Sequence, residues 1–297
     1  MEVMRAFDSY HPLVIFTYFL SVILFSMFFM HPIFLGISLF VSILYLGVLR
    51  GWQNIKKTML FTVPVFLIIA ISNPIFNHKG VTPLFYVNYN PITLEAVIYG
   101  LAMATMIVTV IIWFASYNEV MTSDKFIALF GMVSPNIALL IAMTLNTVPK
   151  MKNQAGIIAD SQKTMGMYIT SGSLMKRARS SVRILSILIT WALENAIDTA
   201  DSMKARGYGL KGRSSYSLFK FRKRDTLLLT TIVLLSAICI YGDIAGFVSF
   251  TFYPYISPVD FSIRGLALYL AYFSLLTIPL IIQLKEAIQW RLSISKI

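Results

Sequence analysis

Residues 92–116 read ITLEAVIYGLAMATMIVTVIIWFAS, and their one charged side chain, Glu95, stands near the start. About 20 apolar helical residues cross the hydrocarbon core of a bilayer, so this stretch predicts a transmembrane helix. The rest of the chain has the same character, with 57% hydrophobic and 13% charged residues among its 297. An average soluble domain has about 25% charged residues. The composition therefore excludes a soluble enzyme, a secreted disulfide scaffold and a disordered protein.

Five other apolar stretches predict membrane-spanning helices, so the expected fold class is all-α, a polytopic membrane protein with about six transmembrane helices. The third of the six is short and interrupted by Pro64. No cleavable signal peptide is expected, because the first apolar stretch is too long for one and no short small-residue cleavage site follows it. The five stretches are 13–30, 33–49, 59–71, 226–241 and 266–284.

The basic residues predict the orientation of these helices. Sixteen of the 25 Lys and Arg residues lie in 117–225, whereas loop 72–91 has only Lys79 and loop 242–263 has none. Lys and Arg are enriched in cytoplasmic loops, so both termini and segment 117–225 are expected in the cytoplasm. The expected organisation is four membrane helices in 1–116, a helical cytoplasmic region in 117–225, and two membrane helices with a short tail in 226–297.

Two apolar stretches inside the cytoplasmic region, 126–148 and 182–193, leave a second topology open. If both crossed the membrane, residues 149–181 would face outside with six basic side chains, against the positive-inside rule. Gly131 and Pro135 also interrupt the first stretch, and the second has the length of a buried helix. The favoured interpretation is that both are helices lying under or against the membrane.

Segment 198–209, DTADSMKARGYG, predicts the end of an amphipathic helix that begins at about Ser181. Asp201 and Lys204 stand three residues apart on one face, and Gly207 follows in the position that glycine favours. Arg206 then lies at the helix C-terminus, where its planar guanidinium can form two hydrogen bonds with a partner's carboxylate. A capped, solvated helix end is the alternative.

Segment 158–166, IADSQKTMG, predicts a second helix end of similar design about forty residues earlier. The region 117–225 also holds eight of the fifteen methionines. Methionine packs adaptably and is frequent at surfaces that meet a partner. Two similar helix ends in such a region suggest two similar docking points.

The sequence lacks the patterns of a self-contained catalyst. It has no phosphate-binding loop with a Lys-Ser/Thr ending, and no His, Cys and carboxylate cluster has metal-ligand spacing. His11 and His31 each precede a proline at a helix start and are expected to cap it. The basic cluster 220–224 abuts the fifth span and is expected to contact lipid headgroups rather than nucleic acid. The predicted spans carry no Asp, Glu, Lys or Arg near their middle, where ion-coupled transporters place ionisable groups.

The helix ends are also where the chain resembles a known family. Ala205-Arg206-Gly207 resembles the Ala-Arg-Gly signature that ends a coupling helix in the CbiQ/EcfT family, the transmembrane T components of energy-coupling factor (ECF) transporters. The resemblance covers nearly the whole chain. It includes the pairs His11-Pro12 and His31-Pro32, and 143–149, MTLNTVP, which is similar to the family's stretch before the first coupling helix.

The chain departs from the family at two places. Thr164-Met165-Gly166 stands where the family usually has a second Ala-Arg-Gly, so the glycine remains and the arginine is absent. Lys163 precedes it, but an ammonium does not replace a bidentate guanidinium. Asn146 stands where an arginine is common in the family. These departures put the strength or symmetry of docking at the first site in question.

The resemblance implies a non-catalytic coupling scaffold of an ABC-type importer in the plasma membrane of a prokaryote. Two ABC-type ATPase subunits would use ATP, this chain would bind no cofactor or metal, and a small membrane subunit would bind a vitamin or a transition-metal ion. A self-contained secondary transporter or channel, and a membrane enzyme acting on lipid, are the alternatives. The implied ATPase-docking residues are Ala205, Arg206, Gly207, Thr164, Met165 and Gly166, supported by Lys163, Lys204 and Asp201.

Overall fold

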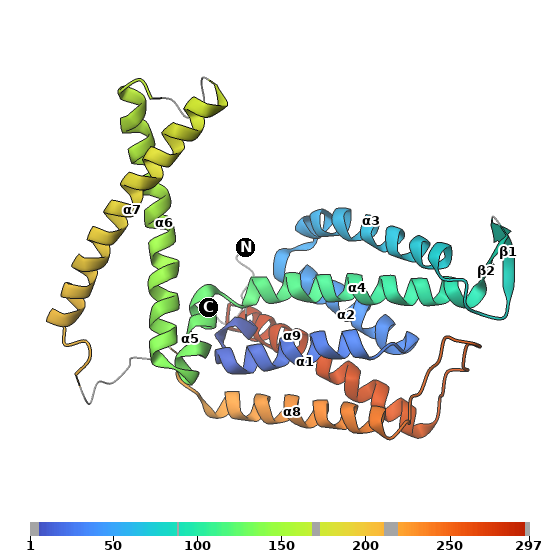
Figure 1. The fold of residues 1–297 in the computed structure, drawn as a ribbon. Coiled ribbons are helices and arrows are strands. Elements are labelled where there is room, and N and C mark those ends of the chain that lie inside the picture. The colour runs from blue at the N-terminus through green and yellow to red at the C-terminus, as the bar shows by residue number, and fades with distance from the viewer. Residues whose placement is uncertain (1–5, 88, 168–172, 211–218, 295–297) are drawn as a thin grey trace. The chain divides into compact units, whose positions relative to one another are not determined.

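The computed structural model describes residues 6–294 except 88, 168–172 and 211–218. The chain forms two compact units, one from residues 1–126 and 219–297 and the other from residues 127–218. The first unit contains the helices that correspond to all six predicted spans (Figure 1). These helices are α1 (Pro12–Phe28), α2 (Pro32–Arg50), α3 (Trp52–Phe76), α4 (Leu94–Val120), α8 (Lys223–Ile244) and α9 (Ile263–Ile294).

The remaining α-helices belong to the basic middle of the chain. The second unit holds α6 (Pro135–Thr164) and α7 (Leu174–Ala205), and α5 (Ser123–Val133) includes the point where the chain leaves the first unit. A short 3-10 helix, η1 (Ala6–Ser9), precedes α1. The apolar stretch 126–148 is broken at Ser134, the residue before Pro135, because a residue before proline disfavours helical geometry.

Six of the described helices are long and apolar enough to cross a membrane, namely α2, α3, α4, α7, α8 and α9, and α1 is a shorter apolar helix of 17 residues. Among the six, α7 has the lowest mean hydropathy, 1.2 against 2.0 to 2.3 for the others. Length and composition therefore single out α7 as the weakest candidate. The six spans inferred from the sequence are α1 to α4, α8 and α9.

Three helices are clearly longer than predicted. The sixth span, predicted at 266–284, is part of α9, which continues to Ile294. The third span, predicted at 59–71, is the longer α3, which continues through Pro64 and Pro74. Membrane helices tolerate proline because neighbouring helices and side chains satisfy the freed backbone groups. The helix predicted from Ser181 begins at Leu174. Its first turn is rich in Lys and Arg, and these residues have good helix propensity, so the apolar pattern alone places the start too late.

A hairpin occupies the part of loop 72–91 that the all-α prediction leaves without structure. Strands β1 (Pro83–Val87) and β2 (Asn90–Thr93) pair antiparallel, with Phe85 opposite Ile92. Ile92 thus belongs to a strand, and the fourth helix begins at Leu94. Thr93 caps that helix by accepting a hydrogen bond from the Ala96 N–H at 3.3 Å. Apart from this hairpin, the described elements are helices.

The core of the first unit lies among α1, α2, α4 and α9. Trp113 is fully buried, and its indole N–H donates to the Ser38 hydroxyl at 3.1 Å. The Ser26 and Ser38 hydroxyls are 2.8 Å apart, and the Tyr18 hydroxyl donates to the Leu276 carbonyl at 2.9 Å. Membrane helices associate through close packing and such interhelical hydrogen bonds, because lipid tails are as apolar as the side chains they replace.

The two His-Pro pairs cap helices, as the sequence predicts. The Nδ1 atom of His11 accepts from the Leu13 N–H at 3.2 Å, and that of His31 accepts from the Ile33 N–H at 3.3 Å. Burial lowers the pKa of both imidazoles. It therefore favours the neutral form, which leaves Nδ1 free to accept. The prolines that follow have no N–H, so the first helical position leaves no backbone donor without an acceptor.

Candidate docking site

The second unit is built on a pair of long helices. Figure 1 shows α6 and α7 crossing each other and running in opposite directions. They contain 30 and 32 residues, so at about 1.5 Å per residue each is roughly 45 Å long. The structure therefore does not bring the two predicted docking points together. The C-terminal end of α6 and that of α7 lie at opposite ends of the pair.

Both helices finish in the same hydrogen-bonded motif. After α6, the Met167 N–H donates to the Gln162 carbonyl and the Gly166 N–H to the Lys163 carbonyl, each at 3.0 Å. After α7, the Tyr208 N–H donates to the Met203 carbonyl and the Gly207 N–H to the Lys204 carbonyl, each at 2.9 Å. This is the Schellman arrangement, which satisfies the last carbonyls of a helix.

The two glycines have the backbone conformation that the motif requires. Gly166 has φ +78° and Gly207 has φ +83°. Side-chain-bearing residues reach this left-handed region only with strain, whereas glycine does so freely. The glycine in each predicted docking motif thus ends its helix. The sequence predicts this role for Gly207 and, by the similar pattern, for Gly166.

The side chains at these helix ends face water in the isolated chain. Thr164, Ala205 and Arg206 are exposed, and Met165 is 67% exposed. Arg206 forms no ion pair with any residue that the structure describes. Lys204 and Asp201 pair at 3.9 Å, with side chains 78% and 72% exposed, and such surface pairs add little stability. The charges at this end are therefore accessible to a partner.

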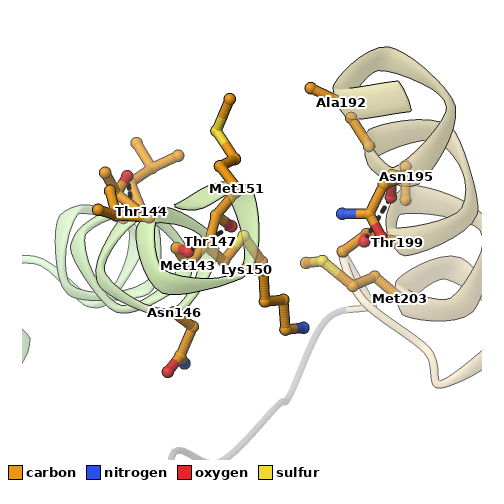
Figure 2. Close-up of a pocket in the computed structure, with 14 residues that line it drawn as sticks. Met143, Thr144, Asn146, Thr147, Lys150, Met151, Ala192, Asn195, Thr199 and Met203 are labelled. Carbon is orange, nitrogen blue, oxygen red and sulfur yellow. Dashed lines mark hydrogen bonds between the residues drawn. The ribbon is translucent and has the colours of Figure 1, made fainter. Parts of the chain in front are cut away.

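A cleft of about 580 Å³ opens between α6 and α7. Figure 2 shows side chains of both helices lining it, with Lys150 on one side and Asn195 on the other. Several of its hydroxyls are already used within their own helices, since Thr147 donates to Met143 and Thr199 to Asn195. The lining is Leu140, Met143, Thr144, Asn146, Thr147, Val148, Lys150, Met151, Ala192, Asn195, Ala196, Thr199, Ala200 and Met203.

The cleft between α6 and α7 is not predicted from the sequence. Methionine is frequent at surfaces that meet a partner, and three methionines of this region, Met143, Met151 and Met203, line the cleft. Asn195 carries no such signal, because nothing in its sequence neighbourhood indicates that α7 crosses α6 at this height. Asn146, noted as a departure from the family, lines the same cleft.

The described residues contain no group of three or more His, Cys, Asp and Glu side chains able to hold a metal ion. A self-contained transporter would need polar side chains in its spans to line a solute path. The Thr105 hydroxyl of α4, however, donates to the Leu101 carbonyl of its own helix at 2.8 Å. Hydroxyls bonded in this way add little polarity to a pathway.

Comparison with known proteins finds several similar proteins that share one name. No family model matches the chain. It is 27% identical to the energy-coupling factor transporter transmembrane protein EcfT of Listeria innocua, over 68% of this chain and 88% of that protein. The protein of the same name from Staphylococcus aureus is 28% identical over 66% of this chain and 76% of its own length. The protein of the same name from Lactobacillus helveticus is 34% identical over 37% of this chain and 40% of its own length. Over about two thirds of its length the chain is thus similar to EcfT proteins, the transmembrane, non-catalytic components of energy-coupling factor transporters.

Proposed function

We propose that the chain is the coupling scaffold of an ABC-type importer and docks two ATPase subunits through the ends of α6 and α7. One observation carries this proposal. The same exposed Schellman end occurs at both extremities of an antiparallel helix pair, and only about 45 Å of helix separates them. One scaffold can thus present two similar ends to two similar partners. Motion of those partners on ATP binding and hydrolysis would move α6 and α7.

The two ends are expected to differ in strength. Arg206 offers a planar guanidinium at the end of α7, next to the exposed Lys204 and Asp201. The corresponding position after α6 is Met165, an exposed apolar side chain. The first site would dock through shape and through Lys163, whose ammonium is a point charge. Docking is therefore proposed to be asymmetric, with the tighter contact at Arg206.

The orientation belongs to the same proposal. Segment 117–225, with both docking ends, would lie in the cytoplasm together with both termini, since it carries most of the basic residues. Helix α7 is apolar enough to be considered as a span, but its exposed face carries Lys176, Arg177, Arg179 and Arg183. A basic amphipathic helix of this kind lies in the membrane interface.

The substrate is proposed to bind elsewhere. A small membrane subunit would hold a vitamin or a transition-metal ion, and this chain would supply no metal, cofactor or ATP site of its own. Purification of the tagged chain from its native membrane in a mild detergent, followed by mass spectrometry, tests the assembly. ABC-type ATPases and a small hydrophobic membrane protein are expected. Recovery of the chain alone, while other complexes stay intact, would favour a self-contained transporter.

The docking residue is tested by Arg206→Glu in the same purification. The ATPases are expected to be lost, and uptake with them, while the small membrane subunit is retained. Lys152→Glu is the matched control, because it reverses an exposed charge near the middle of α6, away from both helix ends. Equal recovery of ATPases with Arg206→Glu and wild type would refute the assignment of Arg206.

A further inference from the structure

The chain passes between its two units twice, outward after Phe126 and back at Phe219. Both passages lie next to one short segment, residues 8–11, which comprises the end of η1 and the two residues before α1. All of the contacts described below lie within the first unit. We name this set of contacts the N-terminal clamp, formed by residues 8–11 with Lys125, Phe221, Arg224 and Asp225.

The outward passage is held by Lys125, in the first turn of α5. Its side chain is almost fully buried, with the residue 5% exposed. The ammonium donates to the carbonyl of Asp8 at 2.8 Å and to that of Val120 at 3.1 Å, and it forms an ion pair with the Asp8 carboxylate. Removing the carboxylate would leave a buried charge without its counterion, which is costly.

The return passage is held by Asp225, in the first turn of α8 and 1% exposed. Its carboxylate accepts from the Arg222 N–H at 2.8 Å and from the His11 N–H at 3.4 Å. It therefore caps α8 and fixes the entry to α1 with the same group. A carboxylate at a helix N-terminus is also favoured by the helix dipole.

Arg224 and Phe221 add contacts to the same segment. The Arg224 guanidinium donates to the Ser9 carbonyl at 2.7 Å and lies 4.8 Å from the centre of the Tyr10 ring. The His11 ring meets the Phe221 ring edge-on, with centres 4.9 Å apart. Three consecutive residues, 9 to 11, thus each contact the start of α8 or the residues just before it.

We propose that the N-terminal clamp is the joint through which displacement of residues 127–218 reaches the membrane helices. The inference rests on the proposed function, in which that unit is moved by ATPases. The clamp segment continues directly into α1, whose Val14, Tyr18 and Val22 are fully buried in the core. A pull on either passage is therefore passed to α1 as well as to α5 and α8.

The buried charges favour a positional role over a purely stabilising one. Replacing a buried ion pair by apolar side chains of similar size is often neutral or stabilising, so stability alone does not call for Lys125 and Asp8 here. A charged pair with several hydrogen bonds, however, holds one geometry. Lys125, Asp8, Arg224 and Asp225 are positioning residues in this proposal.

The test uses the whole complex in liposomes, with ATP hydrolysis and substrate uptake measured in parallel. Asp8→Asn and Arg224→Gln are expected to leave the ATPases bound and hydrolysing but to lower the uptake per ATP by roughly tenfold, within the range by which residues on a coupling path alter it. Asp8→Glu keeps the carboxylate and should restore the ratio. Arg50→Gln is the control, because it breaks another ion pair of this unit, Arg50–Glu119 at 2.8 Å, in which no residue of the clamp takes part.

The outcomes separate the joint from the proposed function. A wild-type complex that lacks ATPases would refute the proposed function itself. A normal ratio in both clamp variants, or a parallel fall of hydrolysis and uptake, would refute the joint. If Asp8→Asn does not insert, Arg224→Gln decides, because the Arg224 side chain is 39% exposed and its loss leaves Asp225 with both backbone donors.

Discussion

Gly166 and Gly207 occupy the same position in two copies of one helix-ending motif. Each donates its N–H to the carbonyl three residues earlier, and the next residue donates to the carbonyl five residues before itself. Both have φ close to +80°. The two helix ends share their backbone conformation, but the residues before the glycines, Met165 and Arg206, differ in charge. Docking strength and helix termination can therefore be tested separately.

A side chain at Gly207 is expected to weaken docking. Gly207→Leu forces an L-residue into the left-handed region, which costs about 1–2 kcal/mol, and its Cβ would meet Leu210 at 3.1 Å. The helix end should rearrange, and recovery of ATPases with the tagged chain should fall while membrane insertion is unchanged.

Gly246 provides the matched control for this prediction. It follows α8 in the same motif, with φ +69° and its N–H donating to the Asp243 carbonyl at 3.0 Å. Gly246→Leu imposes the same strain outside the proposed docking ends and should leave ATPase recovery intact. Normal assembly and uptake with Gly207→Leu would show that this helix end does not dock.

Restoring an arginine after α6 is expected to strengthen or preserve docking. Met165→Arg places a bidentate donor on an exposed position whose backbone already matches the α7 end. The affinity of the purified ATPases for the chain in nanodiscs, measured by titration, should rise or stay unchanged. A marked loss of affinity would mean that the first site is organised differently from the second, with Met165 in an apolar contact.

The core hydrogen bond between Trp113 and Ser38 predicts a stability effect. Ser38→Ala leaves the buried indole N–H without its acceptor, and an unsatisfied buried donor costs about 1–3 kcal/mol. Hydrogen bonds between membrane helices average about 0.6 kcal/mol, so a cost at the lower end of this range is expected. Thermal unfolding of the chain in detergent measures this loss of stability. Ser26→Ala should cost less, because Trp113 keeps its acceptor, and an equal loss would contradict this account.

Apolar length indicates most of the predicted spans, but it also admits α7 and leaves α1 short, so the distribution of basic residues is needed to choose between them. Each of the six predicted spans corresponds to a helix, although α3 extends well beyond 59–71. The hairpin at Pro83–Val87 escapes prediction because a short aromatic stretch in a loop has no periodicity of its own. Its turn depends on Tyr89, a non-glycine residue at φ 64°, which sequence does not indicate.

The helix ends and the clamp differ in predictability for a related reason. The Schellman motifs are local, so glycine after an amphipathic run is enough to predict them. The charged residues of the clamp are separated by about a hundred residues from one to the next, at Asp8, Lys125 and Asp225. No local pattern in the sequence connects them. Their contact follows only once α5 and α8 begin at the same place in the fold.

The His31 cap predicts that stability falls in acid. Its Nδ1 accepts from the Ile33 N–H, and its Nε2 lies 3.3 Å from the Tyr269 hydroxyl, which itself donates to the Asp260 carbonyl. Nε2 must therefore carry the proton, and a second proton on Nδ1 would face the Ile33 donor. Burial lowers the pKa of His31 below its usual 6.5, so the unfolded chain binds more protons. Stability then rises with pH through this window and is lost as pH falls below about 6.5.

His31→Asn isolates this titration, because asparagine caps a helix as well as histidine does here but carries no ionisable group. The variant loses the Tyr269 contact, so its melting temperature is expected to be lower at pH 7.

The decisive quantity is the change in melting temperature between pH 7 and pH 5. It should be smaller in His31→Asn than in wild type, and smaller still when His11→Asn is added, since burial lowers the pKa of that imidazole too. His11 is expected to add less, because the neighbouring Asp225 carboxylate favours its protonated form. An undiminished pH dependence in the double variant would show that groups other than the two caps titrate.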